Sequence, residues 1–174
     1  MKLSLITSIT LSTALIFGCV KNTNSEPRSP GQIIKEAPTD HWRIPNPENL
    51  LYMELESGRV IMELAPEFAP NHTTNIKALA REGFYDGLNF YRVIDGFVAQ
   101  GGDSQDTRQP KQGKSAIDQE FIKKIDKSFT YAALPDKDGF AALTGFKTGF
   151  PISLNAEKSE AWITHCAGVL AMAR

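Results

Sequence analysis

The stretch FYRVIDGFVAQGGD, from Phe90 to Asp103, decides the fold of this chain. Residues 88–94 are rich in apolar and aromatic side chains that favour a β-strand, and the Asp-Gly pair after them ends that strand. Residues 97–100 predict a second short strand, which stops at the glycines before Asp103. Side chains alternate along a strand, so the first strand is expected to have two faces: Phe90, Arg92 and Ile94 on one, Tyr91 and Val93 on the other.

Two further elements are predicted before this stretch. Leu50–Leu55 and Val60–Leu64 are short apolar runs separated by a polar turn, which is typical of a hairpin. Pro70 suits the first position of a helix, in which Ile76 and Leu79 recur at helical spacing and are expected to face a sheet.

The 90–103 stretch resembles the signature of the cyclophilins, the prolyl cis/trans isomerases. That signature is Phe-His-Arg, two apolar residues, a turn, Gly-Phe, two residues and then Gln-Gly-Gly-Asp. The resemblance runs from about Leu50 to the last residue and includes GFYDG at 83–87 and GVLAMA at 168–173. It implies a mainly β fold with helices, namely a cyclophilin-like antiparallel β-barrel.

Three residue types in the stretch suit the rotation of a prolyl bond. The barrier is about 18–20 kcal/mol and reflects resonance, so no nucleophile is needed. The always-charged guanidinium of Arg92 can donate to the prolyl nitrogen as it loses conjugation, an interaction stronger in the twisted state than in the planar states. Phe97 can form a wall for the proline ring, and Gln100 can hold the peptide backbone. The resemblance implies the same three roles. Taken singly, an arginine in a strand is usually solvated and a phenylalanine is usually core.

The resemblance implies further substrate contacts at five positions: Tyr91, Val98, Met172, Ala173 and Arg174. Tyr91 stands where the family usually has His, which removes a titrating group. Val98 replaces a larger apolar residue. Arg174 follows Met-Ala where Asn is common, and that contact is thought to be made largely by backbone.

The resemblance also shapes the expected domain boundaries. We expect a partial cyclophilin-like domain over 50–174, with an insertion at 128–164. The residues themselves predict a surface loop at 104–114, and residues 155–162 are compatible with one or two helical turns. In the family, Met-Ala is followed by further strands, so the barrel is expected to be incomplete at the C-terminus. Activity is therefore expected of the intact protein and left open for these 174 residues.

The N-terminus carries a targeting pattern. Residues 1–18 have an early Lys2 and an apolar run, which predict a signal peptide. Ile16–Cys19 resembles the bacterial lipobox, so Cys19 is expected to be lipidated; a plain cleaved signal is the alternative. Residues 19–49 are then the lipidated cysteine and a flexible tether. The expected location is the bacterial cell envelope, lipid-anchored and facing the periplasm or exported, with the choice of membrane open.

Several other functions are disfavoured. A formal charge of -1 argues against nucleic-acid binding. His41, His72 and the His165-Cys166 pair lack zinc-ligand spacing, and no phosphate-binding glycine loop occurs, so neither metal nor cofactor is expected. Asn71-His72-Thr73 fits a glycosylation sequon, but a helix N-terminus with polar caps is favoured. A monomer is expected.

Three hypotheses follow. The first is a prolyl isomerase that assists the folding of proline-containing envelope or secreted proteins, whose clients the sequence does not identify. The alternative is an inactive module or truncated fragment that binds proline-containing peptides without turnover. The third is that the isolated chain reaches no unique fold.

Overall fold

The computed structural model describes residues 27–173 and divides the chain into two units, Met1–Arg43 and Ile44–Arg174. The predicted signal peptide 1–18, the lipidation site Cys19 and the contact residue Arg174 lie outside the described residues.

A short helix, α1 (Pro30–Glu36), lies within the segment for which the sequence predicts a flexible tether. This helix has a local cause. Ser29 accepts from the backbone N–H of Gln32, whose side chain accepts from the N–H of Ser29, and Pro30 follows at the first helical position. None of its residues is buried, so capping rather than packing supports α1. The 3-10 turn η1 (Thr39–His41) follows it.

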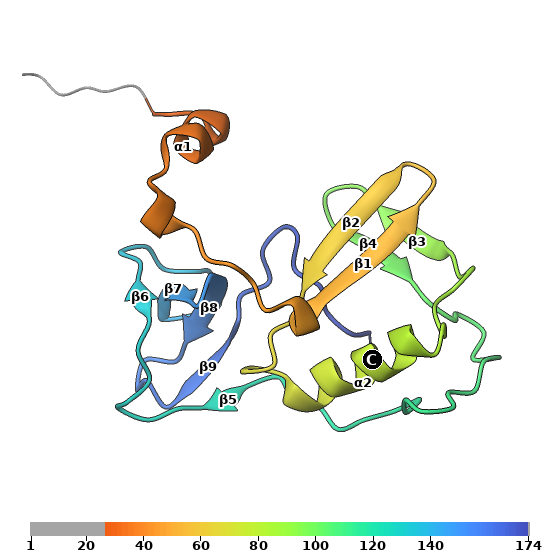
Figure 1. The fold of residues 1–174 in the computed structure, drawn as a ribbon. Coiled ribbons are helices and arrows are strands. Elements are labelled where there is room, and N and C mark those ends of the chain that lie inside the picture. Colours follow the sequence, from red (N-terminus) through yellow and green to blue (C-terminus); the bar gives the residue numbers. More distant parts are fainter. Residues whose placement is uncertain (1–26, 174) are drawn as a thin grey trace, which may run out of the picture. The chain divides into compact units, whose positions relative to one another are not determined.

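In the described part of the second unit, the strands form two separate two-stranded ribbons and one five-stranded sheet, all antiparallel (Figure 1). Among the described residues, these strands do not close a barrel. After the 3-10 turn η2 (Pro47–Asn49), the first ribbon pairs β1 (Leu50–Leu55) with β2 (Gly58–Glu63), which confirms the predicted hairpin.

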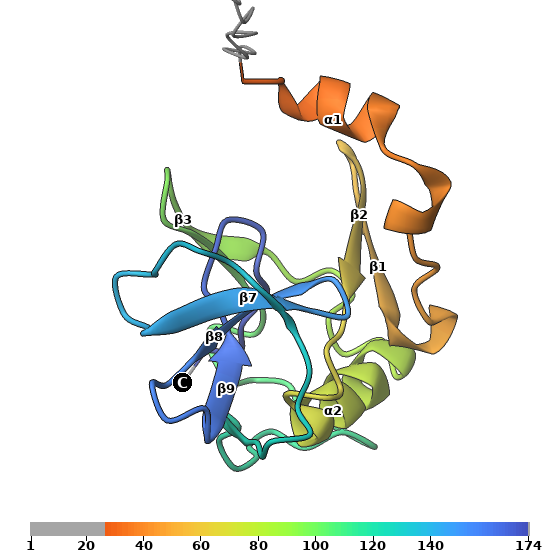
Figure 2. The same ribbon diagram turned by 90° about the vertical axis from the view of Figure 1, so that its left-hand side faces the viewer.

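The five-stranded sheet has the order β5-β9-β8-β7-β6 and contains the buried core. Figure 2 shows three of its strands, β7, β8 and β9. Ile152 and Leu154 of β8 and Ala161 of β9 are fully buried, and Phe68 packs with them. The strand bounds are β5 (Lys123–Lys124), β6 (Ala132–Ala133), β7 (Leu143–Lys147), β8 (Phe150–Leu154) and β9 (Glu160–Ile163).

The helical interpretation of residues 155–162 is wrong. Asn155 uses its side-chain oxygen to accept from the backbone N–H groups of Ser159 and Glu160, both at about 3 Å, so the chain turns there and enters β9. An asparagine side chain that bonds to the backbone competes with helix formation in this way. The 128–164 segment, expected as an insertion, therefore supplies most of the core sheet.

Helix α2 (Pro70–Arg81) forms as predicted, but its surroundings differ from the expectation. Leu79 is buried, and a Cβ on Gly113 would overlap its side chain, so Leu79 packs beneath the loop after β4. The first-turn N–H groups of Asn71 and His72 are capped by the Glu120 carboxylate at 3.0 and 2.9 Å, rather than by local polar residues.

Candidate functional site

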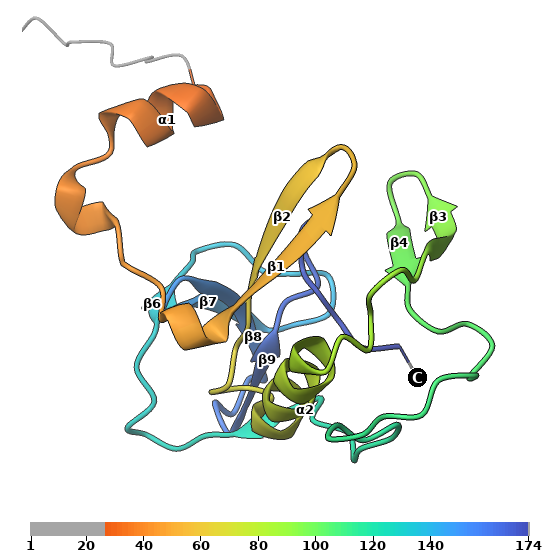
Figure 3. The same ribbon diagram turned by 45° about the vertical axis from the view of Figure 1, so that its right-hand side comes forward.

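The predicted site residues lie on the second ribbon, in which β3 (Phe90–Ile94) pairs with β4 (Val98–Gly101) (Figure 3). The backbone N–H of Phe97 donates to the carbonyl of Ile94 at 3.1 Å and closes the turn. Gly96 has φ +66, a left-handed conformation that glycine adopts without strain. The Asp-Gly pair thus turns the chain and places Phe97 immediately before the returning strand β4.

The ribbon has an irregularity that strict alternation does not predict. Phe90 pairs with Gly101 and Arg92 pairs with Gln100, so β3 has one extra residue, Tyr91, at this point. Such a bulge interrupts the alternation of faces and redirects side chains. The predicted division of β3 into two faces therefore holds only from Arg92 onward.

Arg92, Phe97 and Gln100 come together on this ribbon. Arg92 Nη1 donates to Gln100 Oε1 at 3.2 Å, and Arg92 Cζ lies 5.5 Å from the centroid of the Phe97 ring. That distance is within the range of a cation–π contact. The Phe97 side chain is 74% exposed, and Arg92 is exposed as well, so a peptide can reach both groups from solvent.

This arrangement presents an oriented cation next to an open aromatic surface. A guanidinium has five N–H donors in a rigid plane, and the bond to Gln100 engages one of them and limits rotation of the group. The Phe97 ring adds an apolar surface within reach of the same cation. The chemistry available is hydrogen-bond donation to a weakly basic atom of a substrate that packs on the ring.

The other predicted contact residues are distributed differently. Tyr91 is 47% exposed at the bulge, and Val98 is half-buried opposite Ile94. Met172 and Ala173 are exposed and lie in the coil beyond β9, not on the ribbon. The predicted contact residues within the 90–103 signature therefore lie on one ribbon, whereas residues 172–173 belong to a separate segment of the chain.

Arg108 is a residue of this region that the sequence reading treats only as surface loop. Its Nη1 donates to the carbonyls of Phe84 and Asp86 at 2.6 and 2.9 Å, and its backbone N–H donates to Asp103 Oδ2 at 2.6 Å. That backbone bond is the main cause that lowers the pKa of the Asp103 carboxyl. Asp103, the last residue of the signature, thus connects the following loop to the base of the ribbon. The only sequence signal for this role is the position of Asp103 after two glycines.

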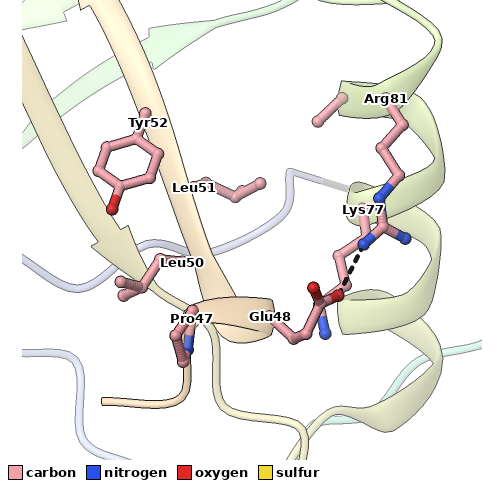
Figure 4. A pocket seen from close by; sticks show the side chains of 8 residues that line it. Pro47, Glu48, Leu50, Leu51, Tyr52, Lys77 and Arg81 are labelled. Carbon is pink, nitrogen blue, oxygen red and sulfur yellow. Dashed lines mark hydrogen bonds and ion pairs between the residues drawn. The ribbon is translucent and has the colours of Figure 1, made fainter. Parts of the chain in front are cut away.

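A cavity of about 260 Å³ lies away from the ribbon, between η2, β1 and α2 (Figure 4). Arg81 Nη2 lies 2.9 Å from Glu48 Oε2 at its rim, and Lys77 Nζ donates to Asn49 Oδ1 at 2.7 Å. No predicted site residue lines it. The oriented Arg92 on the ribbon, not the size of this cavity, identifies the candidate site.

Residues 27–173 contain neither a cluster of metal-ligand side chains nor a helix that could span a membrane. No group of three or more His, Cys, Asp or Glu side chains in this part of the chain could hold a metal ion. His72 Nδ1 instead lies 2.7 Å from Glu120 Oε2. No described helix has the length and apolar character needed to cross a membrane.

Residues 50–174 match the family model described as "Cyclophilin type peptidyl-prolyl cis-trans isomerase/CLD". A crystal structure of cyclophilin AquaCyp293 from Hirschia baltica is similar, with a TM-score of 0.66 and 41% sequence identity, over 76% of this chain and 54% of that chain.

Curated relatives agree with the family match. A "Probable peptidyl-prolyl cis-trans isomerase" of Brucella suis is 52% identical over 58 residues, which cover 33% of this chain and 30% of the relative. "Peptidyl-prolyl cis-trans isomerase B" of Bacillus subtilis is 60% identical over 52 residues, or 29% and 36% of the two chains. The human "Peptidyl-prolyl cis-trans isomerase-like 1" is 34% identical over 111 residues, or 59% and 63%. The matches thus span about a third of the first relatives.

Proposed function

Because the chain belongs to the cyclophilin-type peptidyl-prolyl cis-trans isomerase family, we propose that it accelerates rotation about X-Pro bonds in proline-containing polypeptides. The observation that carries this proposal is the hydrogen bond between Arg92 and Gln100 beside the Phe97 ring. The reaction is non-covalent and needs no metal or cofactor group, since it breaks only the resonance of one peptide bond.

Arg92 acts on the prolyl nitrogen. In either planar isomer this nitrogen shares its lone pair with the carbonyl and accepts hydrogen bonds poorly. As the bond twists, the lone pair returns to nitrogen, and an N–H of Arg92 donates to it. Because the interaction is stronger in the twisted state than in the planar states, it lowers the barrier rather than only binding substrate.

Gln100 and Phe97 position the Arg92 guanidinium and the substrate proline relative to each other. Gln100 accepts from Arg92 and orients the guanidinium, while its side-chain amide N–H groups are of the type that binds a peptide carbonyl. Phe97 supplies the apolar surface against which the proline ring rests. The ring position is thereby set relative to the cation that lies 5.5 Å from the Phe97 centroid.

The test is the exchange rate between the cis and trans forms of an Ala-Pro peptide, measured by NMR with the purified full chain. Arg92→Ala is expected to lower the acceleration by about 100-fold, as for the loss of one transition-state donor. Arg59→Ala is a matched control, because Arg59 also lies on a two-stranded ribbon, over the ring of Tyr52 and paired with Glu54, away from the proposed site. Acceleration that is absent, or equal in wild type and Arg92→Ala, would contradict the proposal.

A second candidate function is peptide binding without turnover. The β3–β4 ribbon exposes large apolar side chains, including Tyr91, Val93 and Phe97, which favours contact with a peptide whether or not rotation is catalysed. This candidate predicts peptide affinity that survives Arg92→Ala, in a folded protein that gives no acceleration.

We further propose a location in the bacterial cell envelope with Cys19 as the lipid-bearing residue. The support is the sequence pattern at 1–19 alone. Mass spectrometry of the protein purified from bacterial membranes is expected to find Cys19 acylated at a new N-terminus, and a Cys19→Ala variant is expected to lose the modification. Recovery of an unmodified N-terminus at another position would contradict the anchor.

A further inference from the structure

A second cavity, of about 170 Å³, lies at the base of the β3–β4 ribbon. The segment that enters β3 and the segment that leaves β4 both line it, and the Gly102 N–H donates to the Asn89 carbonyl between them at 3.4 Å. An engineered protein cavity of about 150 Å³ holds one benzene molecule. The space is therefore suited to the end of a single side chain, not to a cofactor.

The cavity adjoins the proposed catalytic residues through Tyr91. Tyr91 lines the cavity, and it is the extra residue of the bulge, immediately before Arg92. Consecutive Cα atoms are about 3.8 Å apart, and an extended peptide advances about 3.3 Å per residue. A peptide whose proline lies at Arg92 can thus place a residue one or two positions away at the cavity.

The lining is polar and carries negative charge. Asn89, Ser104 and Gln105 line it and have side-chain oxygens that can accept hydrogen bonds. The acid Asp103 lines it as well, and its carboxylate accepts from Thr107 Oγ1 and the Arg108 N–H. Backbone N–H donation from Arg108 favours the ionised form of Asp103 and lowers its pKa.

The segments that line the cavity carry more acidic than basic side chains. Asp86 and Asp106 are exposed acids on the flanking turn and loop. Arg108 is the one cation between residues 84 and 108 besides Arg92, and its Nη1 bonds to the carbonyls of Phe84 and Asp86.

We propose that this cavity is a specificity subsite, which takes a Lys or Arg side chain within two residues of the isomerised proline. The proposal rests on the proposed function for its place in the reaction. The ammonium or guanidinium would meet the oxygens of Asn89, Ser104 and Gln105 and the field of Asp103. Exposed charge pairs contribute about 0.2–1 kcal/mol, so the preference for Lys over Glu is expected to be about 1.4- to fivefold at low salt.

The experiment compares proline peptides, with Ala elsewhere, that have Lys or Glu at each of the two positions before the proline and the two positions after it. Fluorescence anisotropy gives the Kd, and NMR exchange gives the isomerisation rate. Gln105→Lys places a cation on the cavity wall and is expected to reverse the preference at the sensitive position. Gln112→Lys is the matched control, since it adds the same charge on the same loop outside the cavity and is expected to keep the Lys preference.

The outcomes separate this subsite from the proposed function. A Lys preference at one position that Gln105→Lys reverses and Gln112→Lys retains supports the subsite, even if no peptide is isomerised and the enzyme proposal fails. Equal Kd values for Lys and Glu peptides at all four positions overturn the subsite, even if all peptides are isomerised. Equal changes in both lysine variants also overturn it, because they would reflect net charge alone.

Discussion

At the residue scale, the bond between Gln100 and Arg92 is the feature that distinguishes the candidate site from an ordinary exposed arginine. Exposed cations generally contribute little to stability and rotate freely. Here the amide oxygen at 3.2 Å and the nearby Phe97 ring restrict the guanidinium from two directions. Positioning of this kind reduces the entropic cost of orienting the catalytic group in the transition state.

The first prediction concerns Gln100 as a positioning residue. Gln100→Leu keeps the approximate size of the side chain but removes the oxygen that accepts from Arg92. We expect kcat for an Ala-Pro peptide to fall by about fivefold, because one net hydrogen bond of about 1 kcal/mol orients the guanidinium. Gln100→Glu restores an acceptor and is expected to recover part of the loss. Equal losses in both variants would show that the amide contacts the substrate rather than Arg92.

The second prediction concerns a buried glycine of the core sheet. A Cβ on Gly145 in β7 would overlap the carbonyl oxygen of Ala132 and the ring of Tyr131. Backbone of a neighbouring strand cannot move away easily, so Gly145→Ala is expected to lower the free energy of unfolding by about 1–3 kcal/mol. Gly139→Ala is the control, since nothing lies within 4 Å of its Cβ position. Urea unfolding measures both, and equal midpoints would contradict the packing described for β7.

At the scale of elements, the N-terminus of α2 depends on a residue far away in sequence. Its N-cap residue, Ala69, has no capping side chain. Glu120 bonds to the N–H groups of Asn71 and His72 and to the His72 ring. The carboxylate also lies where the helix dipole favours negative charge. Helix α2 is therefore joined to the segment that leads into β5.

The third prediction is the pH dependence of this contact. Burial raises the pKa of Glu120, but the bonds from His72 and Asn71 outweigh it and lower the pKa below its ordinary value of 4.5. A lowered folded-state pKa means that the contribution to stability is present above about pH 4.5 and is lost as the pH falls through the folded-state pKa. Stability is thus expected to decline on acidification.

Glu120→Gln tests this dependence. Urea unfolding near pH 7 is expected to show a loss of about 0.5–2 kcal/mol, the usual range for a lost cap. The difference from wild type should shrink as the pH falls through the folded-state pKa of Glu120, which lies below 4.5, because the wild-type carboxyl then becomes protonated. Glu157→Gln, an exposed acid in the turn after β8, is the control and is expected to leave the stability near pH 7 unchanged. A deficit that stays constant with pH would argue against the role of the charge.

At the scale of the whole molecule, burial is unevenly distributed in the described residues. The fully buried side chains Ile152 and Leu154 lie on β8, while β3 is exposed along its length. Amides in regions with little buried apolar surface exchange through local openings, and core amides exchange only on larger unfolding.

The fourth prediction follows from this distribution. Hydrogen exchange is expected to be slowest in β7, β8 and β9 and faster in the β3–β4 ribbon. Leu154→Ala is expected to lower global stability by about 2–5 kcal/mol, whereas Ile61→Ala, at a 61% exposed side chain, should change it by less than about 0.5 kcal/mol. Mass spectrometry of exchange checks the order, and strongest protection in the ribbon would contradict it.

Local signals in the sequence determined the two ribbons, the start of helix α2 and the grouping of the candidate site residues. The Asp-Gly turn and flanking apolar residues predicted the β3–β4 ribbon, and its signature placed Arg92, Phe97 and Gln100 within reach of one another. Pro70 predicted the start of α2, and two short runs predicted the β1–β2 hairpin. These features succeed because turn conformations, strand alternation and helix starts depend on residues close together in the chain.

Only the tertiary structure decided the rest. The bulge at Tyr91 depends on how β4 pairs with β3, and the strand after Asn155 depends on pairing with β8. Glu120 caps a helix 48 residues before it in sequence, and Arg108 reaches back to Phe84. Sheet pairing and such polar contacts join segments distant in sequence, so the free energy that selects them comes from the assembled fold and leaves no periodic signal in the chain.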